Sequence, residues 1–156
     1  MFHVKHCFLR KESLNVEQIY VERLLELASK AFATDEAPVA ALITHNDKII
    51  AEAYNQRNKS NSTIAHAEIE TIKIANKKLN NWRLNNCALY VTVKPCEMCE
   101  KVIKEARIER VLYLVEREPI KRQYNKTKFI KLKELADNNL VLEYRKLLAD
   151  FWKNKR

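Results

Sequence analysis

Two cysteines, Cys96 and Cys99, are spaced as metal ligands on the first turn of a helix. They follow Pro95, a residue favoured at the first turn of a helix, and the apolar run before the proline predicts a buried strand. Residues three apart share one helix face, so both sulfurs can reach a single ion, and a helix N-terminus favours the thiolate that a metal requires. A CxxC pair is also typical of thiol redox sites, so the pair alone leaves both chemistries open.

A histidine and a glutamate, His66 and Glu68, stand at the start of the preceding predicted helix. A neutral imidazole is a good third zinc ligand, and a carboxylate beside a metal can move protons. Residues two apart in mid-helix point in nearly opposite directions, so both can serve one site only if the helix N-terminus faces the metal. Three protein ligands leave one position open, as in catalytic zinc sites, where the metal activates water for attack. We therefore predict one Zn²⁺ per chain, held by His66, Cys96 and Cys99, with Glu68 as the catalytic proton carrier.

The order of the predicted elements can bring these two helix starts together. Strands joined through helices tend to pair in parallel, which places both helix starts at one edge of a sheet whose faces the helices cover. Asn15 is the expected N-cap of the first helix, and residues 54–63 and 117–128 are expected loops. Apolar periodicity predicts helices over residues 16–33, 65–79, 96–106, 129–137 and 144–154, and strands over residues 37–43, 48–53, 88–93, 108–115 and 140–143.

The chain contains no glycine. Turns that need a positive φ must therefore use another residue, and asparagine is the next best choice. Asparagine pairs and one Asn-Asp pair predict such turns at residues 46–47, 80–81, 85–86 and 138–139.

Length and composition indicate one globular domain over residues 1–156. No apolar run approaches the roughly 20 residues that cross a bilayer, and the N-terminal residues lack a signal-peptide pattern. We therefore expect a cytoplasmic protein with no membrane partner.

Lysine and arginine outnumber the acids by 29 to 20, which gives a net charge of +9. A charge of this size favours binding to a polyanion such as nucleic acid. A lysine-rich composition that merely reflects an AT-rich genome would give the same charge, and the many Lys, Asn and Ile residues fit that origin, so charge leaves this question open.

The segment His66-Ala67-Glu68, followed after 26 residues by Pro95-Cys96-x-x-Cys99, resembles the signature of the zinc-dependent nucleobase deaminases. The segment Glu36–Ala41, Asn55, and residues 82–84, 106–108 and 150–156 resemble those of the bacterial tRNA-specific adenosine deaminases. This resemblance implies a cytidine-deaminase-like α/β fold, with three layers (α/β/α) and a mixed five-stranded sheet. It also implies a homodimer that binds a tRNA anticodon stem-loop and converts adenosine to inosine at the wobble position, A34.

The same resemblance predicts substrate contacts from Val39, Asn55, Phe151 and Arg156. Asn55 could instead be an ordinary turn residue, and the aromatic pair Phe151-Trp152 could close a core rather than stack on a base. Residues 114–121 depart from the glycine-rich stretch of the family. Residues 117–156 are therefore predicted to form a divergent C-terminal part of the domain, and residues 1–15 an N-terminal extension.

Two other functions compete with tRNA editing. The same zinc chemistry could act on free cytosine, guanine or cytidine, although the positive charge and the aromatic, basic C-terminus favour RNA. Alternatively, the chain could be a catalytically impaired, zinc-containing RNA-binding or partner subunit. The presence of Glu68 argues against this last function, because a purely structural site needs no proton carrier.

Overall fold

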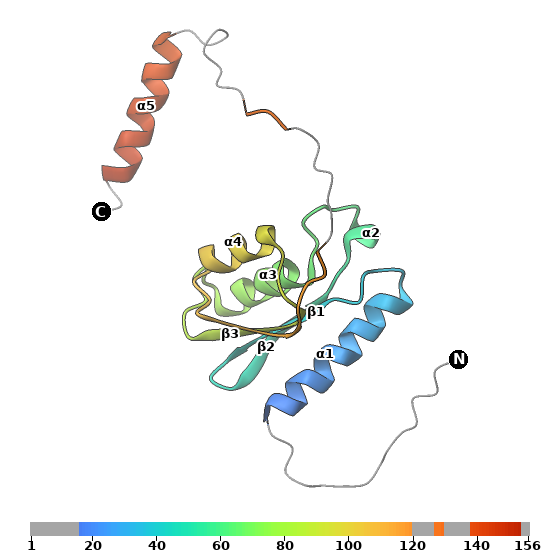
Figure 1. Cartoon of the computed structure of the whole chain (residues 1–156). Coiled ribbons are helices and arrows are strands. Elements are labelled where there is room, and N and C mark those ends of the chain that lie inside the picture. Colours follow the sequence, from blue (N-terminus) through green and yellow to red (C-terminus); the bar gives the residue numbers. More distant parts are fainter. Residues whose placement is uncertain (1–15, 120–126, 130–137, 154–156) are drawn as a thin grey trace, which may run out of the picture. The chain divides into compact units, whose positions relative to one another are not determined.

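The computed structural model describes residues 16–119, 127–129 and 138–153. The chain divides into two compact units, Met1–Pro119 and Ile120–Arg156, and the second holds the last helix (Figure 1). The elements in order are α1 (Val16–Ala33), β1 (Ala40–His45), β2 (Lys48–Tyr54), α2 (Arg57–Ser60), α3 (Ala67–Leu79), β3 (Cys87–Val93), α4 (Glu97–Glu105), β4 (Arg110–Val115) and α5 (Asn138–Lys153).

The strands of the first unit form one mixed sheet in the order β2-β1-β3-β4. Strand β1 is antiparallel to both β2 and β3, whereas β3 and β4 are parallel. Strands β2, β3 and β4 therefore run in the same direction. Because α3 follows β2 and α4 follows β3, both helices begin at the same edge of the sheet, as predicted.

Helices cover both faces of this sheet and complete the predicted α/β/α layers (Figure 1). On one face, α1 buries Tyr20 and Leu24 against Leu42 of β1. On the other face, α3 and α4 pack over Ile43 and Leu89, both of which are fully enclosed. Each such aliphatic side chain contributes about 1.5–3 kcal/mol to stability, so the two clusters hold the helix starts firmly against the sheet.

Residues other than glycine supply the positive φ angles that the turns require. Asn46 and Asp47, with φ of 49° and 57°, form a two-residue hairpin turn between His45 and Lys48, which pair across the strands. Asn80 ends α3 with φ of 48°, and Asn86, with φ of 60°, precedes β3. The turns predicted at 46–47, 80–81 and 85–86 are thus confirmed, whereas residues 138–139 begin α5 rather than a turn.

The helices predicted over residues 16–33, 65–79 and 96–106 are confirmed as α1, α3 and α4, with bounds that differ by two residues at most. The expected loop over residues 54–63 contains a short helix, α2. Asn15, the rest of the N-terminal extension, and most of the predicted short helix at 129–137 lie outside the described residues.

The prediction of a fifth strand is wrong, since residues 140–143 belong to α5 and the sheet has four strands in the described part of the chain. The four residues contain the apolar run Leu140-Val141-Leu142, which reads as a strand when taken alone. Over a longer window, apolar residues recur at positions 140, 141, 144, 147, 148 and 151, the spacing of one helical face. The longer period decides the structure, and the last helix begins six residues earlier than predicted.

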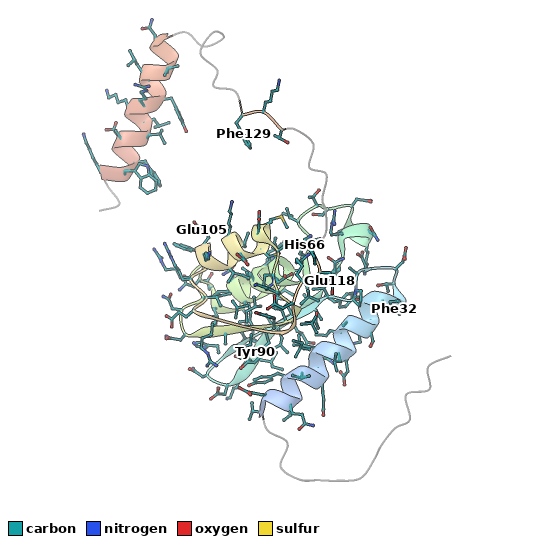
Figure 2. The ribbon with its side chains drawn as sticks, viewed as in Figure 1. Phe32, His66, Tyr90, Glu105, Glu118 and Phe129 are labelled. Carbon is teal, nitrogen blue, oxygen red and sulfur yellow. The ribbon has the colours of Figure 1, made fainter. Side chains whose placement is uncertain are left out.

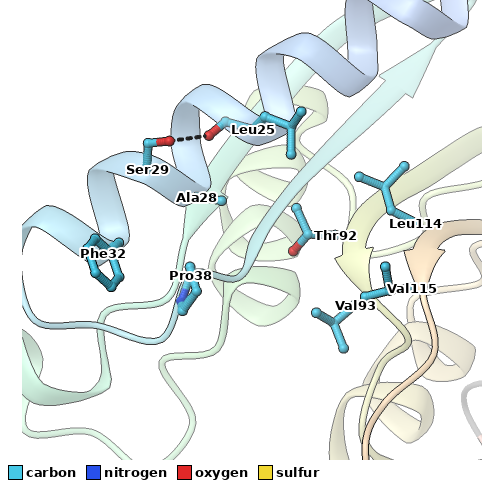
Figure 3. Close-up of a pocket in the computed structure, with 9 residues that line it drawn as sticks. All are labelled: Leu25, Ala28, Ser29, Phe32, Pro38, Thr92, Val93, Leu114 and Val115. Atoms are coloured by element: carbon cyan, nitrogen blue, oxygen red, sulfur yellow. Dashed lines mark hydrogen bonds between the residues drawn. The ribbon is translucent and has the colours of Figure 1, made fainter. Parts of the chain in front are cut away.

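An apolar hollow of about 460 Å³ lies beside α1, lined by side chains of α1, β3 and β4 (Figure 3). None of its nine lining residues carries a titratable side chain. The hollow therefore lacks groups for acid–base or metal chemistry.

Among the described helices, none is both long and apolar enough to cross a membrane.

Candidate metal centre

The two predicted ligand segments occupy equivalent places in the fold. His66 is the N-cap residue of α3 and Cys96 is the N-cap residue of α4, each with an extended backbone conformation. Neither side chain caps its own helix. Because the two helices begin at one sheet edge, their positively polarised N-termini converge on the same place and favour thiolates there.

Three ligand atoms meet at this place: His66 Nδ1 and the Sγ atoms of Cys96 and Cys99 all lie within 4.8 Å of one another (His66 is labelled in Figure 2). The distance from His66 Nδ1 to Cys96 Sγ is 3.7 Å and to Cys99 Sγ is 3.5 Å. In tetrahedral zinc with ordinary Zn–N and Zn–S bonds, a nitrogen and a sulfur ligand are about 3.6 Å apart. The donor set and the two nitrogen–sulfur distances thus fit a zinc ion.

The carboxylate of Glu68 lies enclosed in the protein, with only 1% of the residue exposed. Both of its oxygens lack a hydrogen-bond partner, and they are the only fully enclosed side-chain oxygen or nitrogen atoms in the described residues of which this is true. Burial raises the pKa of Glu68, although the charge of Arg117 acts in the opposite direction. An enclosed, unpaired carboxylate is costly, so it calls for a metal, a water molecule or a catalytic role.

The environment of Cys99 also calls for a cation. Burial raises the pKa of this thiol well above its usual value, and the negative charges of Glu68 and Cys96 raise it further. Two thiols and a carboxylate so close together repel one another when ionised. A divalent ion reverses this penalty, because it deprotonates the thiols that coordinate it.

The other predicted site residues fall into three groups. Asn55 and Val39 lie in the first unit, where the Asn55 backbone N–H donates to the Val39 carbonyl at 2.9 Å. Phe151 lies on α5 in the second unit, half exposed, with its ring against Trp152 at a centroid distance of 5.1 Å. Arg156 lies outside the described residues.

Sequence reasoning missed two residues near the site. Glu36 is a buried carboxylate that binds the side-chain amide of Asn55, and only its place in the segment Glu36–Ala41 could have drawn attention to it. Arg117 is half-buried and donates from Nε to the carbonyl of Lys94 at 3.2 Å, two residues before Cys96. Nothing in the sequence distinguishes Arg117 from the other basic residues that follow β4.

A family model described as the cytidine and deoxycytidylate deaminase zinc-binding region matches residues 14–115, so the chain belongs to this family. The resemblance to bacterial tRNA-specific adenosine deaminases is also confirmed. The chain is 32% identical over 147 residues to the tRNA-specific adenosine deaminase of Buchnera aphidicola, with 91% of this chain and 97% of the relative covered. It is 38% identical over 97 residues to that of Bacillus subtilis, with 62% and 60% covered.

The chain covers different shares of its relatives. It spans 60% of the Bacillus subtilis relative and 8% of a chloroplastic tRNA(adenine(34)) deaminase of Arabidopsis thaliana.

Two solved structures are similar to the structure of this chain. One, from a study of A-to-I editing by tRNA:A34 deaminases, has a TM-score of 0.62 and 36% identity, with 65% of this chain and 78% of that chain covered. A guanine deaminase of Bacillus subtilis has a TM-score of 0.66 and 27% identity, with 83% and 93% covered.

Proposed function

We propose that the chain is a zinc-dependent enzyme that hydrolyses adenosine to inosine at position 34 of a tRNA anticodon. The observation that carries the proposal is the enclosed, unpartnered carboxylate of Glu68 beside the cluster of His66, Cys96 and Cys99. The choice of substrate rests on the similarity to the Buchnera aphidicola tRNA-specific adenosine deaminase, which extends over nearly the whole of both chains.

His66 Nδ1, Cys96 Sγ and Cys99 Sγ would hold one zinc ion and leave one coordination position open. The zinc supplies the capacity to make water a nucleophile at neutral pH. The two helix N-termini orient the three side chains, so their geometry depends on the sheet rather than on mobile loops.

Glu68 is the proposed proton carrier. Its carboxylate accepts one proton from the attacking water and passes it to the ring nitrogen. It then accepts the proton of the newly attached hydroxyl group and passes it to the amino group, which leaves as ammonia. A raised pKa suits this role, since the carboxyl group holds a proton more readily than an exposed glutamate does. Enclosure also keeps bulk water from competing for that proton.

We assign the substrate contacts to the four residues that the family resemblance points to, namely Val39, Asn55, Phe151 and Arg156. Phe151 would stack on a base of the anticodon loop, and Arg156 would meet the phosphate backbone. The net charge of +9 supports binding to a polyanion. Arg117 supports it too, because it places a cation close enough to act on Glu68.

A second candidate substrate is a free base such as guanine. It is favoured by the Bacillus subtilis guanine deaminase structure, which covers more of this chain than the tRNA-editing structure does. Free cytosine or cytidine would undergo the same chemistry. A third possibility, an impaired RNA-binding or partner subunit, requires that Glu68 serve no purpose.

The test uses zinc-loaded full-length protein and two kinds of substrate. One is an anticodon stem-loop with A34, compared with the same RNA carrying its adenosine elsewhere in the loop; the other is guanine, cytosine and cytidine as free compounds. Inosine formed at A34 alone is the expected result. Product from the free compounds only would overturn the proposal in favour of the second candidate, and RNA binding without product would favour the third.

We also infer, from the family resemblance, that the enzyme is a homodimer that acts in the cytoplasm. Sedimentation equilibrium of the full chain should give twice the monomer mass of 18.4 kDa. A monomer at the concentrations of the activity assay would contradict this inference.

A further inference from the structure

A buried carboxylate, that of Glu36, joins two segments beside the candidate metal centre. Glu36 is 4% exposed, and it stands three residues after the end of α1, where its backbone N–H donates to the Ala31 carbonyl at 3.0 Å. One carboxylate oxygen accepts a hydrogen bond from Asn55 Nδ2 at 2.8 Å, and the other accepts one from the Lys59 backbone N–H at 2.8 Å. Both oxygens are therefore engaged, and the anchored backbone fixes where they lie.

The contact with Glu36 determines the orientation of the Asn55 amide. A carboxylate facing an amide can only accept, so the NH₂ group of Asn55 must point toward Glu36 and the amide cannot be turned over. No hydrogen-bond partner of Asn55 Oδ1 exists among the described residues, and Oδ1 is not one of the fully enclosed unpaired atoms, so solvent reaches it. Asn55 thus keeps one edge open, with Oδ1 as acceptor and the second N–H as donor.

The backbone holds Asn55 beside the metal ligands. Asn55 directly follows β2, at the sheet edge where α3 and α4 begin, and its N–H donates to the Val39 carbonyl at 2.9 Å. The next residue, Gln56, donates its N–H to the carbonyl of Ala65 at 3.0 Å, and Ala65 immediately precedes His66. The open edge of Asn55 is consequently fixed close to the residues that would hold the metal.

We propose that Glu36 is a positioning residue for the deamination, which acts by fixing the amide of Asn55 so that its acceptor–donor edge meets the substrate base. This inference rests on the proposed function. An edge with one acceptor and one donor matches a base that carries an amino group next to a ring nitrogen, as adenine does. An amide free to turn over would present the edge correctly only part of the time, and the weaker binding would appear mainly in KM.

A purely structural role is the alternative, because Glu36 also ties residues 57–60 to the end of α1 through the Lys59 N–H. The two roles predict different kinetics. Loosening of the loop would lower the fraction of active enzyme, and hence kcat, whatever residue stands at position 55. Positioning through Asn55 changes KM only while Asn55 is present.

The test is a double-mutant cycle with Glu36→Gln and Asn55→Ala, assayed on the A34 stem-loop with zinc content measured for each variant. Glutamine keeps the shape of glutamate, but its single amide oxygen can accept only one of the two hydrogen bonds, and its NH₂ group faces the other donor. We expect Glu36→Gln to raise KM about tenfold and leave kcat within about threefold. In the Asn55→Ala background, the same substitution should change KM less than about twofold.

The matched control is Asn58→Ala, which removes another link between the same two segments, the bond from Asn58 Nδ2 to the Asp35 carbonyl at 2.8 Å. This control should keep wild-type kinetics. Equal effects of Glu36→Gln with and without Asn55, or a loss confined to kcat, would overturn the inference. If Glu36→Gln does not fold, Glu36→Asp, which withdraws the carboxylate by one methylene, replaces it with the same expected result.

A readout independent of turnover separates this inference from the proposed function. In ¹⁵N spectra, the side-chain amide of Asn55 should show one proton protected from exchange, and Glu36→Gln should remove that protection while Asn58→Ala should not. Absence of protection in the wild type would overturn the inference even if A34 is deaminated. A protected amide in an enzyme that does not deaminate A34 would contradict the proposed function and leave the Glu36–Asn55 contact established.

Discussion

Glu68→Gln is the substitution that tests the proposed chemistry most directly. Glutamine fills the same enclosed space, since the carboxylate has no hydrogen-bond partner that an amide would lose. The substitution leaves the three ligand residues His66, Cys96 and Cys99 unchanged, so the variant should bind one zinc per chain as the wild type does. It can no longer take up a proton.

The expected loss is large because the site has no replacement for Glu68. It is the only enclosed carboxylate at the cluster in the part of the chain that the structure describes. General acid–base catalysis contributes roughly 10²–10⁴-fold, and Glu68 would handle protons both in the attack of water and in the departure of ammonia. We therefore expect kcat to fall about 10³–10⁴-fold, equivalent to about 4–5.5 kcal/mol of transition-state stabilisation.

The assay measures inosine formation in single turnover on the A34 stem-loop, with zinc quantified in the same preparations. Glu70→Gln is the matched control, as it makes the same change two residues later in α3. Glu70 pairs at 3.0 Å with Lys73, whose side chain is largely exposed, so its loss should cost at most about 1 kcal/mol of stability and leave turnover unchanged. A zinc-loaded Glu68→Gln variant with more than about a tenth of wild-type turnover would refute the proton-carrier role.

Three further changes test the metal centre and the fold. Cys99→Ser should reduce bound zinc to well below one per chain, because a buried thiolate ligand is lost; full occupancy by elemental analysis would contradict the ligand assignment. Glu52→Gln should cost about 1 kcal/mol at pH 7, since a hydrogen bond from Arg23 holds the pKa of Glu52 below its usual value of 4.5. That stabilisation is present above pH 4.5 and is lost as the pH falls through the lowered pKa, so the difference in urea unfolding between the two proteins should shrink as the pH is lowered below 4.5; a difference that stays constant with pH would be evidence against it. Asn80→Ala should lower stability by about 1 kcal/mol while Asn80→Gly should not, because position 80 has φ of 48°; equal melting temperatures for both variants would show that the left-handed residue carries no cost.

The ligand residues could be predicted because each pattern is local and chemically specific. His66 and the cysteine pair each stand at a helix start, which the sequence marks by Pro95 and by the onset of apolar periodicity. Their convergence follows from strand direction, since β2 and β3 run the same way. Two helix starts at one sheet edge could therefore be inferred from the sequence.

The contacts of the buried polar groups could not be predicted in the same way. The hydrogen bond between Glu36 and Asn55 joins residues 19 apart through the end of α1 and the end of β2. No period or spacing encodes it, because it depends on how α1 packs across the sheet. The strand prediction for residues 140–143 failed for the opposite reason. The local apolar run was clear, but the longer helical period determined the structure.

The unfavourable placement of Glu68 is itself informative about how the fold supports the site. An enclosed carboxylate without partners costs stability, yet it stands on the first turn of α3, a helix that packs over a fully enclosed layer with Ile43, Leu89 and Val91. That apolar layer stabilises the helix whether or not Glu68 is satisfied. A residue that lowers stability and breaks the usual pairing of buried polar groups is expected where function requires it. Glu36 differs from Glu68, because each of its two carboxylate oxygens accepts a hydrogen bond. That environment suits a group that holds another residue in place rather than one that exchanges protons.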